Sequence, residues 1–207
     1  MNTAIELQQV IANEYHELIS TVLASEITSV TKLSQGLSGA TTYKLSCVDK
    51  EYVLKITTPE AQRLISGKHN EYKNMLQIMS DCEIIPKIHY IELRRGIILM
   101  DYINPKPYSL SQNEHLQKMV KLLNKLHQIQ GCDGLQKCSL GGYLSYADDN
   151  LQEIKESHTL PPYVDGLRKR IDLIKDIVES NWSYQLCHLD INPSNVIYDG
   201  SKFYLLD

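Results

Sequence analysis

The sequence has little net charge and no long apolar segment. Its 207 residues carry 21 Lys and Arg against 25 Asp and Glu, so the formal net charge is -4. A nucleic-acid-binding protein normally shows a basic excess or a basic patch, so this balance argues against that class. No apolar run approaches the roughly 18 residues that a membrane-spanning helix needs, and the N-terminal residues lack the pattern of a secretory signal. We expect neither a nucleic-acid partner nor a membrane span.

Cysteine is sparse and has no paired spacing. The five cysteines are odd in number and contain no C-x-x-C pair. We therefore expect reduced, mostly buried thiols in a cytoplasmic protein. The hydrophobic fraction of 43% and the charged fraction of 22% are those of an ordinary globular chain.

The first half of the sequence predicts a helix followed by strands. Apolar residues recur at helical spacing over residues 4–24. From Ile27 onward, β-branched and apolar residues alternate with polar ones, and turn-forming residues divide them into runs. Three consecutive antiparallel strands are expected, over residues 27–33, 43–47 and 52–56.

A proline marks the expected start of a second helix. Pro59 follows Thr58, and a threonine cap before a proline is typical of a helix N-terminus. The helix is expected to end near Ile78, with Gly67 as a candidate break. Two more strand-like runs, joined by a short turn, follow over residues 84–93 and 97–103.

The second half is mainly helical. Residues 104–107 contain two prolines, so they form the candidate linker between two lobes. Ser111 and Glu114 have the spacing of a capping box, which predicts a helix start. The apolar face of that helix is expected to contain Leu116, Met119, Val120, Leu123, Leu126 and Ile129. A further helix is expected over residues 163–178, and a hairpin over residues 195–198 and 203–206.

The sharpest local feature is the pattern H-x-D-x-x-x-x-N, formed by His188, Asp190 and Asn195. It lies just before the expected hairpin, and that hairpin ends on Asp207. This arrangement suits phosphoryl transfer, in which positioning and charge neutralisation supply most of the catalysis. Asp190 would accept or orient the proton of an attacking hydroxyl, and His188 would brace the loop. Asn195 and Asp207 would supply oxygen ligands to Mg²⁺. The alternative is that Asp190 and Asn195 are ordinary loop residues at a turn.

Residues 186–198, which contain this motif, resemble the catalytic loop and following strand of a known family. It is the group of small-molecule kinases that includes choline kinases and aminoglycoside phosphotransferases, and residues 205–207 resemble the segment before its metal-binding aspartate. The resemblance implies an α+β, bilobal protein-kinase-like fold that uses ATP and Mg²⁺. An N-terminal lobe with an antiparallel sheet would occupy residues 1–103, and a mainly helical, incomplete C-terminal lobe residues 104–207.

The resemblance also assigns a nucleotide site to the first half. Lys55 would contact the nucleotide phosphates, and Glu71 in the following helix would be its ion-pair partner. The alternatives are a solvated lysine and an exposed helix charge, with Glu60 as a competitor for the pairing. The resemblance further implies a phosphate-covering loop with Gly36, Ser38 and Gly39, and an adenine-binding hinge with Met100, Asp101 and Ile103. Taken alone, the loop is only a turn and Met100 is equally a core residue.

Two departures from the kinase pattern limit the function. Leu189 stands where protein kinases have the Arg of H-R-D, and no A-P-E segment follows, which disfavours a protein kinase. The chain stops at Asp207, so we expect a fragment that lacks the segment selecting the acceptor.

The expected activity is ATP- and Mg²⁺-dependent phosphorylation of a small-molecule hydroxyl. The acceptor expected from the resemblance of residues 187–198 is a cationic amino alcohol such as choline or ethanolamine. Aminoglycoside phosphorylation is the alternative enzyme, since both branches share the motifs present. A non-catalytic, nucleotide-binding kinase remnant is the alternative of another class.

Overall fold

The computed structural model describes residues 13–33, 40–58, 67–130 and 185–206, together with residues 164, 166, 169 and 170. The chain divides into two compact units, one of Met1–Leu135 with Leu186–Asp207 and one of Gln136–Gln185. In the second unit the four isolated described residues are helical; the rest of the helix expected over residues 163–178 lies outside the described residues. A lobe boundary after residue 103 stays a prediction.

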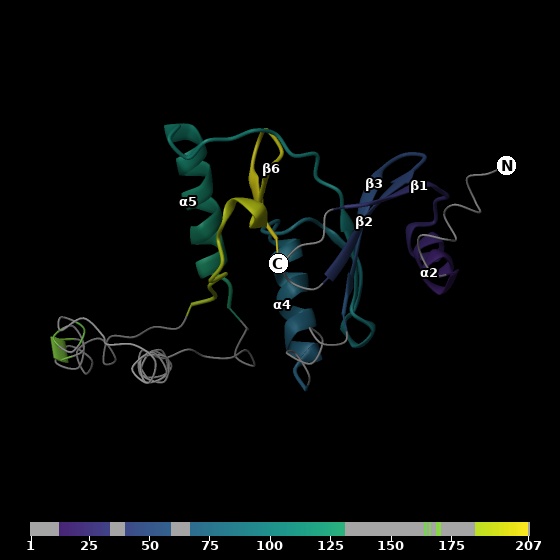
Figure 1. The fold of residues 1–207 in the computed structure, drawn as a ribbon, viewed down its shortest axis with the longest axis horizontal. Coiled ribbons are helices and arrows are strands. Elements are labelled where there is room, and N and C mark those ends of the chain that lie inside the picture. The colour runs from purple at the N-terminus through teal and green to yellow at the C-terminus, as the bar shows by residue number, and fades with distance from the viewer. Residues whose placement is uncertain are drawn as a thin grey trace. The chain divides into compact units, whose positions relative to one another are not determined.

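An antiparallel sheet of five strands dominates the first unit (Figure 1). Its order is β1-β2-β3-β5-β4, so the three strands expected in succession are neighbours. The strands are β1 (Ile27–Lys32), β2 (Ala40–Cys47), β3 (Glu51–Thr57), β4 (Ile88–Glu92) and β5 (Ile97–Asp101). All five expected strands are confirmed, with shifted ends.

The two faces of the sheet pack against different helices (Figure 1). Helix α2 (Asn13–Leu23) covers one face, where Ile19 packs with Tyr52 and Leu54 of β3. Helix α4 (His69–Asp81) belongs to the core of the other face, together with Ile98 and Met100 of β5. Successive strand residues point to opposite faces, so each strand contributes to both cores.

The start of β4 corrects one predicted boundary, whereas the predicted start of the helix before it is untested. Helix α4 begins at His69, after Gly67 with φ +82°, and the start expected at Pro59 lies outside the described residues. Strand β4 begins at Ile88, so the predicted start at Ile84 was wrong. The N–H of Ile84 donates to the carbonyl oxygen of Met79 at 2.9 Å, which closes the end of α4 instead of extending the sheet.

Helix α5 (Asn113–His127) follows the predicted linker, and residues 102–109 have no regular structure. The predicted capping box was wrong: Gln112 is the N-cap, and the Ser111 hydroxyl bonds to the Ser109 hydroxyl at 2.8 Å. Glu114 instead pairs with Lys118 at 2.7 Å.

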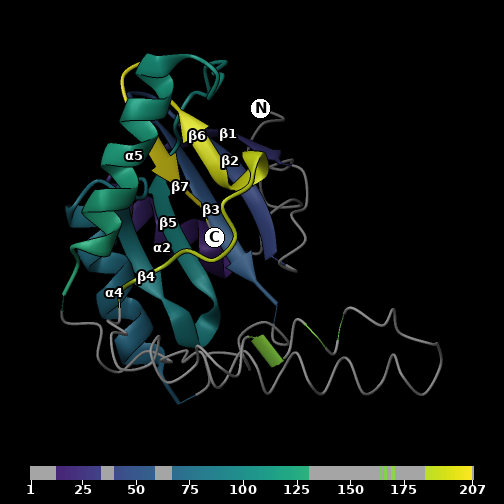
Figure 2. The same ribbon diagram turned by 90° about the vertical axis from the view of Figure 1, so that its left-hand side faces the viewer.

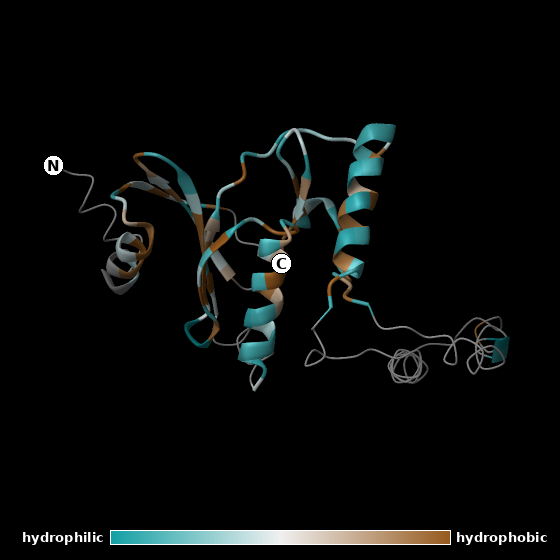
Figure 3. Ribbon diagram, turned by 180° about the vertical axis from the view of Figure 1, so that it is seen from behind, coloured by the Kyte–Doolittle hydropathy of each residue, from teal (hydrophilic) through white to brown (hydrophobic). Residues whose placement is uncertain are grey.

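The buried face of α5 matches the predicted one in part. Met119, Leu122 and Leu126 are buried, whereas Leu116 and Val120 are each 46% exposed. Leu123 and Ile129 are partly buried against the same core, so four of the six predicted residues face it and Leu122 was missed. Figure 3 shows hydrophilic and hydrophobic residues interleaved along α5.

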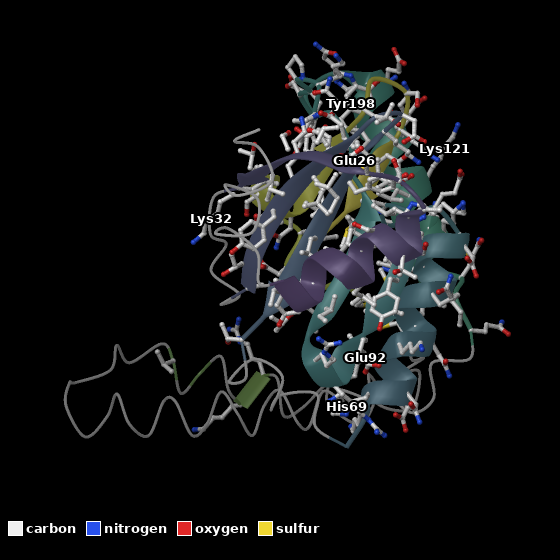
Figure 4. The ribbon with its side chains drawn as sticks, turned by 90° about the vertical axis from the view of Figure 1, so that its right-hand side faces the viewer. Glu26, Lys32, His69, Glu92, Lys121 and Tyr198 are labelled. Atoms are coloured by element: carbon white, nitrogen blue, oxygen red, sulfur yellow. The ribbon has the colours of Figure 1, made fainter. Side chains whose placement is uncertain are left out.

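The predicted hairpin is confirmed as β6 (Val196–Tyr198) and β7 (Phe203–Leu205), preceded by the 3₁₀ turn η2 (Pro193–Asn195). Figure 2 shows it beside α5. Tyr198, labelled in Figure 4, ends β6, and its carbonyl oxygen accepts from the N–H of Lys106 in the linker at 2.7 Å. The N–H of Leu205 donates to the carbonyl oxygen of Ile84 at 2.9 Å. The hairpin is thus bonded both to the linker and to the segment that follows α4.

Three cysteines can be compared with the prediction, and all three are free thiols. Cys47 is buried and Cys82 half-buried, as expected, but Cys187 is exposed. Burial raises the pKa of the Cys47 thiol, which favours its protonated form. Cys132 and Cys138 lie outside the described residues. None of the helices in the described ranges is long and apolar enough to cross a membrane.

Candidate active site

The motif loop turns sharply at Leu189. This residue has φ +64°, in the left-handed region that a leucine seldom adopts, and its side chain is 74% exposed. On its two sides, His188 is half-buried and Asp190 is exposed. The turn therefore separates a histidine that faces the protein from a carboxylate that faces solvent.

The structure brings Asp190 and Asn195 into direct contact. The Asn195 side-chain Nδ2 donates to Asp190 Oδ2 at 2.8 Å and to the Asp190 carbonyl oxygen at 3.0 Å. These two bonds orient the amide, and among the described residues no donor contacts its other end, Oδ1. That oxygen is the kind of neutral ligand that Mg²⁺ accepts.

His188 connects the motif loop to the end of the hairpin. Its Nε2 donates to the carbonyl oxygen of Leu206 at 2.7 Å, and the N–H of Leu206 donates to the carbonyl oxygen of Asn195 at 2.9 Å. The other ring nitrogen, Nδ1, is buried and has no hydrogen-bond partner within the described ranges. Leu206 is therefore bonded on both sides to the loop, although Asp207 itself lies outside the described residues.

The contact of Asn192 with Asp190 was not predicted from the sequence. Asn192 Nδ2 donates to Asp190 Oδ1 at 2.9 Å, while Asn192 Oδ1 accepts from the backbone N–H of Ser194 at 2.9 Å. Both carboxylate oxygens of Asp190 are thus hydrogen-bonded to side-chain amides. The only sequence signal was the Asn-Pro dipeptide at residues 192 and 193, which is typical of a turn.

Lys55 lies in the middle of β3, opposite Ile98 of β5. The register places it on the sheet face of Ile98 and Met100, because paired residues share a face. Burial lowers the pKa of its ammonium group below the ordinary value, since a charged group is poorly solvated there. A half-buried lysine in a central strand is not the solvated edge residue of the alternative interpretation.

Glu71 is exposed in the first turn of α4. Within the described ranges it makes no ion pair with Lys55, so the structure does not bring the two expected partners together. Its role stays a prediction. The competitor Glu60 and the loop residues Gly36, Ser38 and Gly39 lie outside the described residues.

Of the three hinge residues, Asp101 has its side chain on the face opposite Lys55, because it pairs with Tyr52. Its Oδ1 contacts His89 Nε2 at 2.6 Å and Lys50 Nζ at 2.7 Å. The carboxylate therefore joins the end of β5 to His89 in β4 and to Lys50 in the turn before β3, contacts that depend on strand register.

Met100 and Ile103 fit the predicted hinge differently. Met100 pairs with Val53 of β3 and lies on the face of Lys55. The backbone N–H and C=O of Ile103 make no hydrogen bond within the described part of the chain. These two groups are therefore available to a ligand.

The chain matches one protein-family model, described as phosphotransferase enzyme family, over residues 29–207. No curated protein sequence matches it. Similar solved structures include choline kinase LicA from Streptococcus pneumoniae, with a TM-score of 0.58 and 20% identity over 94% of this chain and 68% of that one. The APH(2")-IIa structure with streptomycin and ATP has a TM-score of 0.61 and 18% identity, over 95% of this chain and 69% of that one.

A Plasmodium vivax ethanolamine kinase is also similar, with a TM-score of 0.59 and 16% identity over 99% of this chain and 66% of that one. At such identities the similarity concerns the fold, and it confirms the expected kinase-like architecture. The chain spans about two thirds of these structures, between 66% and 69% of their lengths.

Proposed function

The chain belongs to the phosphotransferase enzyme family, and on this basis we propose that it transfers the γ-phosphoryl group of ATP to a hydroxyl of a small molecule. The observation that carries the proposal is the direct contact of Asp190 with Asn195, at 2.8 Å, in a loop bonded to Leu206. An exposed carboxylate held beside an amide oxygen can receive a hydroxyl group on one side and a metal-bound phosphate on the other.

In this reaction Asp190 orients the acceptor hydroxyl and takes up its proton as the oxygen attacks phosphorus. The carboxylate is exposed, so an acceptor can reach it from solvent. His188 and the Asn195 backbone keep Leu206, and hence the chain entering Asp207, against this loop. Fixed geometry of this kind supplies much of the rate enhancement in phosphoryl transfer.

Asn195 and Asp207 are the proposed Mg²⁺ ligands. Asn195 fits, because its Nδ2 is directed to Asp190 and leaves its amide oxygen without a hydrogen bond among the described residues. Bound Mg²⁺ would neutralise charge on the phosphate oxygens. A hard cation with few protein oxygens suits this donor set.

The proposed donor is ATP, bound on the sheet face of Lys55. The ammonium group of Lys55 would contact the phosphates, and the open backbone groups of Ile103 would bond the adenine ring. A structural neighbour was solved with ATP, and another, a spectinomycin phosphotransferase, with ADP. Glu71 would support Lys55 and the loop of Gly36, Ser38 and Gly39 would cover the phosphates.

The proposed acceptor is a cationic amino alcohol such as choline or ethanolamine. Its support is the resemblance of residues 187–198 to the catalytic loop of that branch, together with the choline and ethanolamine kinases among the structural neighbours. Because one structural neighbour is a complex with streptomycin, an aminoglycoside is included as an acceptor in the test.

The test supplies the full-length protein with ATP and Mg²⁺ and offers choline, ethanolamine and streptomycin separately. We expect phosphorylation of an amino alcohol, and a loss of about 10³-fold in kcat for Asp190→Ala. The matched control is Asp81→Ala, which removes an exposed carboxylate that contacts only Gln77 among the described residues. Phosphorylation of streptomycin alone would make an aminoglycoside the acceptor in place of an amino alcohol. ATP binding without any phosphate transfer would support the alternative of a non-catalytic remnant.

A further inference from the structure

The side chain of Asn192 bridges two groups of the motif loop. Its Nδ2 donates to Asp190 Oδ1 at 2.9 Å. Its Oδ1 accepts from both the backbone N–H of Ser194, at 2.9 Å, and the Ser194 hydroxyl. Because the amide oxygen is fixed by Ser194, the amide nitrogen has one direction left, and that direction is toward Asp190.

Asn192 is also the N-cap of the turn η2, but capping does not account for both ends of its amide. A cap needs only an acceptor, which aspartate or serine supplies as well as asparagine. Aspartate has no donor, and serine has a single hydroxyl hydrogen on a shorter side chain, so asparagine is the one of the three that accepts from Ser194 and presents an amide donor to a carboxylate. Its identity is therefore explained by the contact with Asp190.

Asp190 needs such support because little else holds it. The side chain is exposed, so packing does not fix its rotamer. Asn195 Nδ2 holds Oδ2 at 2.8 Å and Asn192 Nδ2 holds Oδ1, and no cationic side chain pairs with this carboxylate in the described part of the chain. Neutral donors fix its direction and leave its negative charge in place to receive a proton.

We propose that Ser194 and Asn192 form a positioning relay, in which the Ser194 hydroxyl orients the Asn192 amide and the amide orients Asp190 for the acceptor hydroxyl. This inference rests on the proposed function, since it assumes that Asp190 receives the acceptor proton. Asn192 and Ser194 are positioning residues, and they touch neither substrate in this account.

Two substitutions at Asn192 separate positioning from capping. Asn192→Asp and Asn192→Ser both keep a capping acceptor, so the melting temperature should stay close to that of the wild type. Both lose the amide donor, and Asn192→Asp adds a like charge beside Asp190. We expect kcat to fall about tenfold in Asn192→Ser and about 100-fold in Asn192→Asp, with an unchanged KM for ATP. Values of kcat within twofold of the wild type, or losses that merely follow the melting temperature, would overturn the relay.

A double-mutant cycle tests the link to Ser194. Ser194→Ala should lower kcat about fivefold in the wild-type background and have no further effect in Asn192→Ser, since residues of one network are coupled. Independent, multiplying losses would contradict the relay. The matched control is Ser201→Ala, because the Ser201 hydroxyl bonds to Asp199 Oδ1 at 2.8 Å in the same local pattern, in the hairpin turn. It should leave kcat unchanged.

A spectroscopic measurement decides the relay even if the proposed function fails. In ¹⁵N-labelled protein, the Asn192 side-chain amide proton that bonds to Asp190 should lie downfield and move upfield in both Asp190→Ala and Ser194→Ala. The Asn195 amide should respond to Asp190→Ala alone. If the wild type transfers no phosphate, the proposed function is wrong. If the Asn192 amide responds to neither substitution, the relay is wrong.

Discussion

The Nε2 atom of His188 donates a 2.7 Å hydrogen bond to the carbonyl oxygen of Leu206. This bond and the 2.9 Å bond from the Leu206 N–H to Asn195 join the motif loop to the residue before Asp207. The two segments that the proposed mechanism needs side by side are therefore held together by these two hydrogen bonds.

Removing the hydrogen bond from His188 to Leu206 should lower the stability of the protein. His188→Ala leaves the half-buried Leu206 carbonyl without its donor, which we expect to lower the free energy of unfolding by about 1–3 kcal/mol. Urea unfolding measures this loss. The control is Gln77→Ala, which removes an exposed 3.0 Å hydrogen bond to Asp81 and should change stability by less than about 0.5 kcal/mol. Equal changes in the free energy of unfolding for the two substitutions would show that the His188 bond stabilises the protein no more than an exposed hydrogen bond does.

Leu189 should tolerate glycine better than an ordinary exposed leucine does. Its φ of +64° strains a leucine by roughly 1–2 kcal/mol. Glycine relieves this strain, and the relief offsets the larger conformational entropy that glycine loses on folding. Leu189→Gly should therefore leave the free energy of unfolding unchanged or raise it by up to about 1 kcal/mol. The matched control is Leu116→Gly, in the exposed part of α5, which should lower it by about 1 kcal/mol. Similar losses at both sites, measured by thermal unfolding, would argue against the left-handed turn.

Lys55 should be unfavourable for stability and required for nucleotide binding. Burial lowers the pKa of its ammonium group from the ordinary value of 10.5. Between the lowered pKa and 10.5 the unfolded chain binds more protons, so the stability of the wild type rises with pH across that window. Lys55→Met lacks this rise, so its stability advantage should be largest below the window and shrink toward pH 10.5.

Urea unfolding at several pH values and ATP titration measure these two effects. The control is Lys121→Met, which replaces an exposed lysine of α5 and should alter neither quantity. A stability difference between wild type and Lys55→Met that stays constant with pH would contradict the assigned burial. Unimpaired ATP binding in Lys55→Met would remove the residue from the nucleotide site.

The carboxylate of Asp101 should contribute to stability and not to ATP binding. Its carboxylate bonds to His89 at 2.6 Å and to Lys50 at 2.7 Å, on the face opposite Lys55. Asp101→Asn weakens both contacts and should lower the free energy of unfolding by about 1 kcal/mol, with the KM for ATP unchanged. A raised KM for ATP at unchanged stability would instead assign the carboxylate itself to the nucleotide site.

Local patterns predicted the strands and the hairpin because alternation and turn residues act over a few positions. The motif placed Asp190 and Asn195 in one site, but their direct hydrogen bonds were not predicted. The sequence did not reveal the partners of Asp101, because His89 and Lys50 belong to other segments and depend on register. It also misplaced the start of α5, where a Ser109–Ser111 contact competes with the predicted cap.

The central claim is that Asp190 serves the transfer of phosphate to a hydroxyl. The most direct measurement follows phosphorus-31 signals while the full-length protein acts on ATP, Mg²⁺ and choline or ethanolamine, with Asp190→Asn in parallel. Asparagine keeps the size of the side chain but cannot take up the proton. We predict that a phosphorylated amino alcohol accumulates with the wild type, and about 10³-fold more slowly with Asp190→Asn at unchanged ATP affinity. Equal rates for the two proteins would contradict the account.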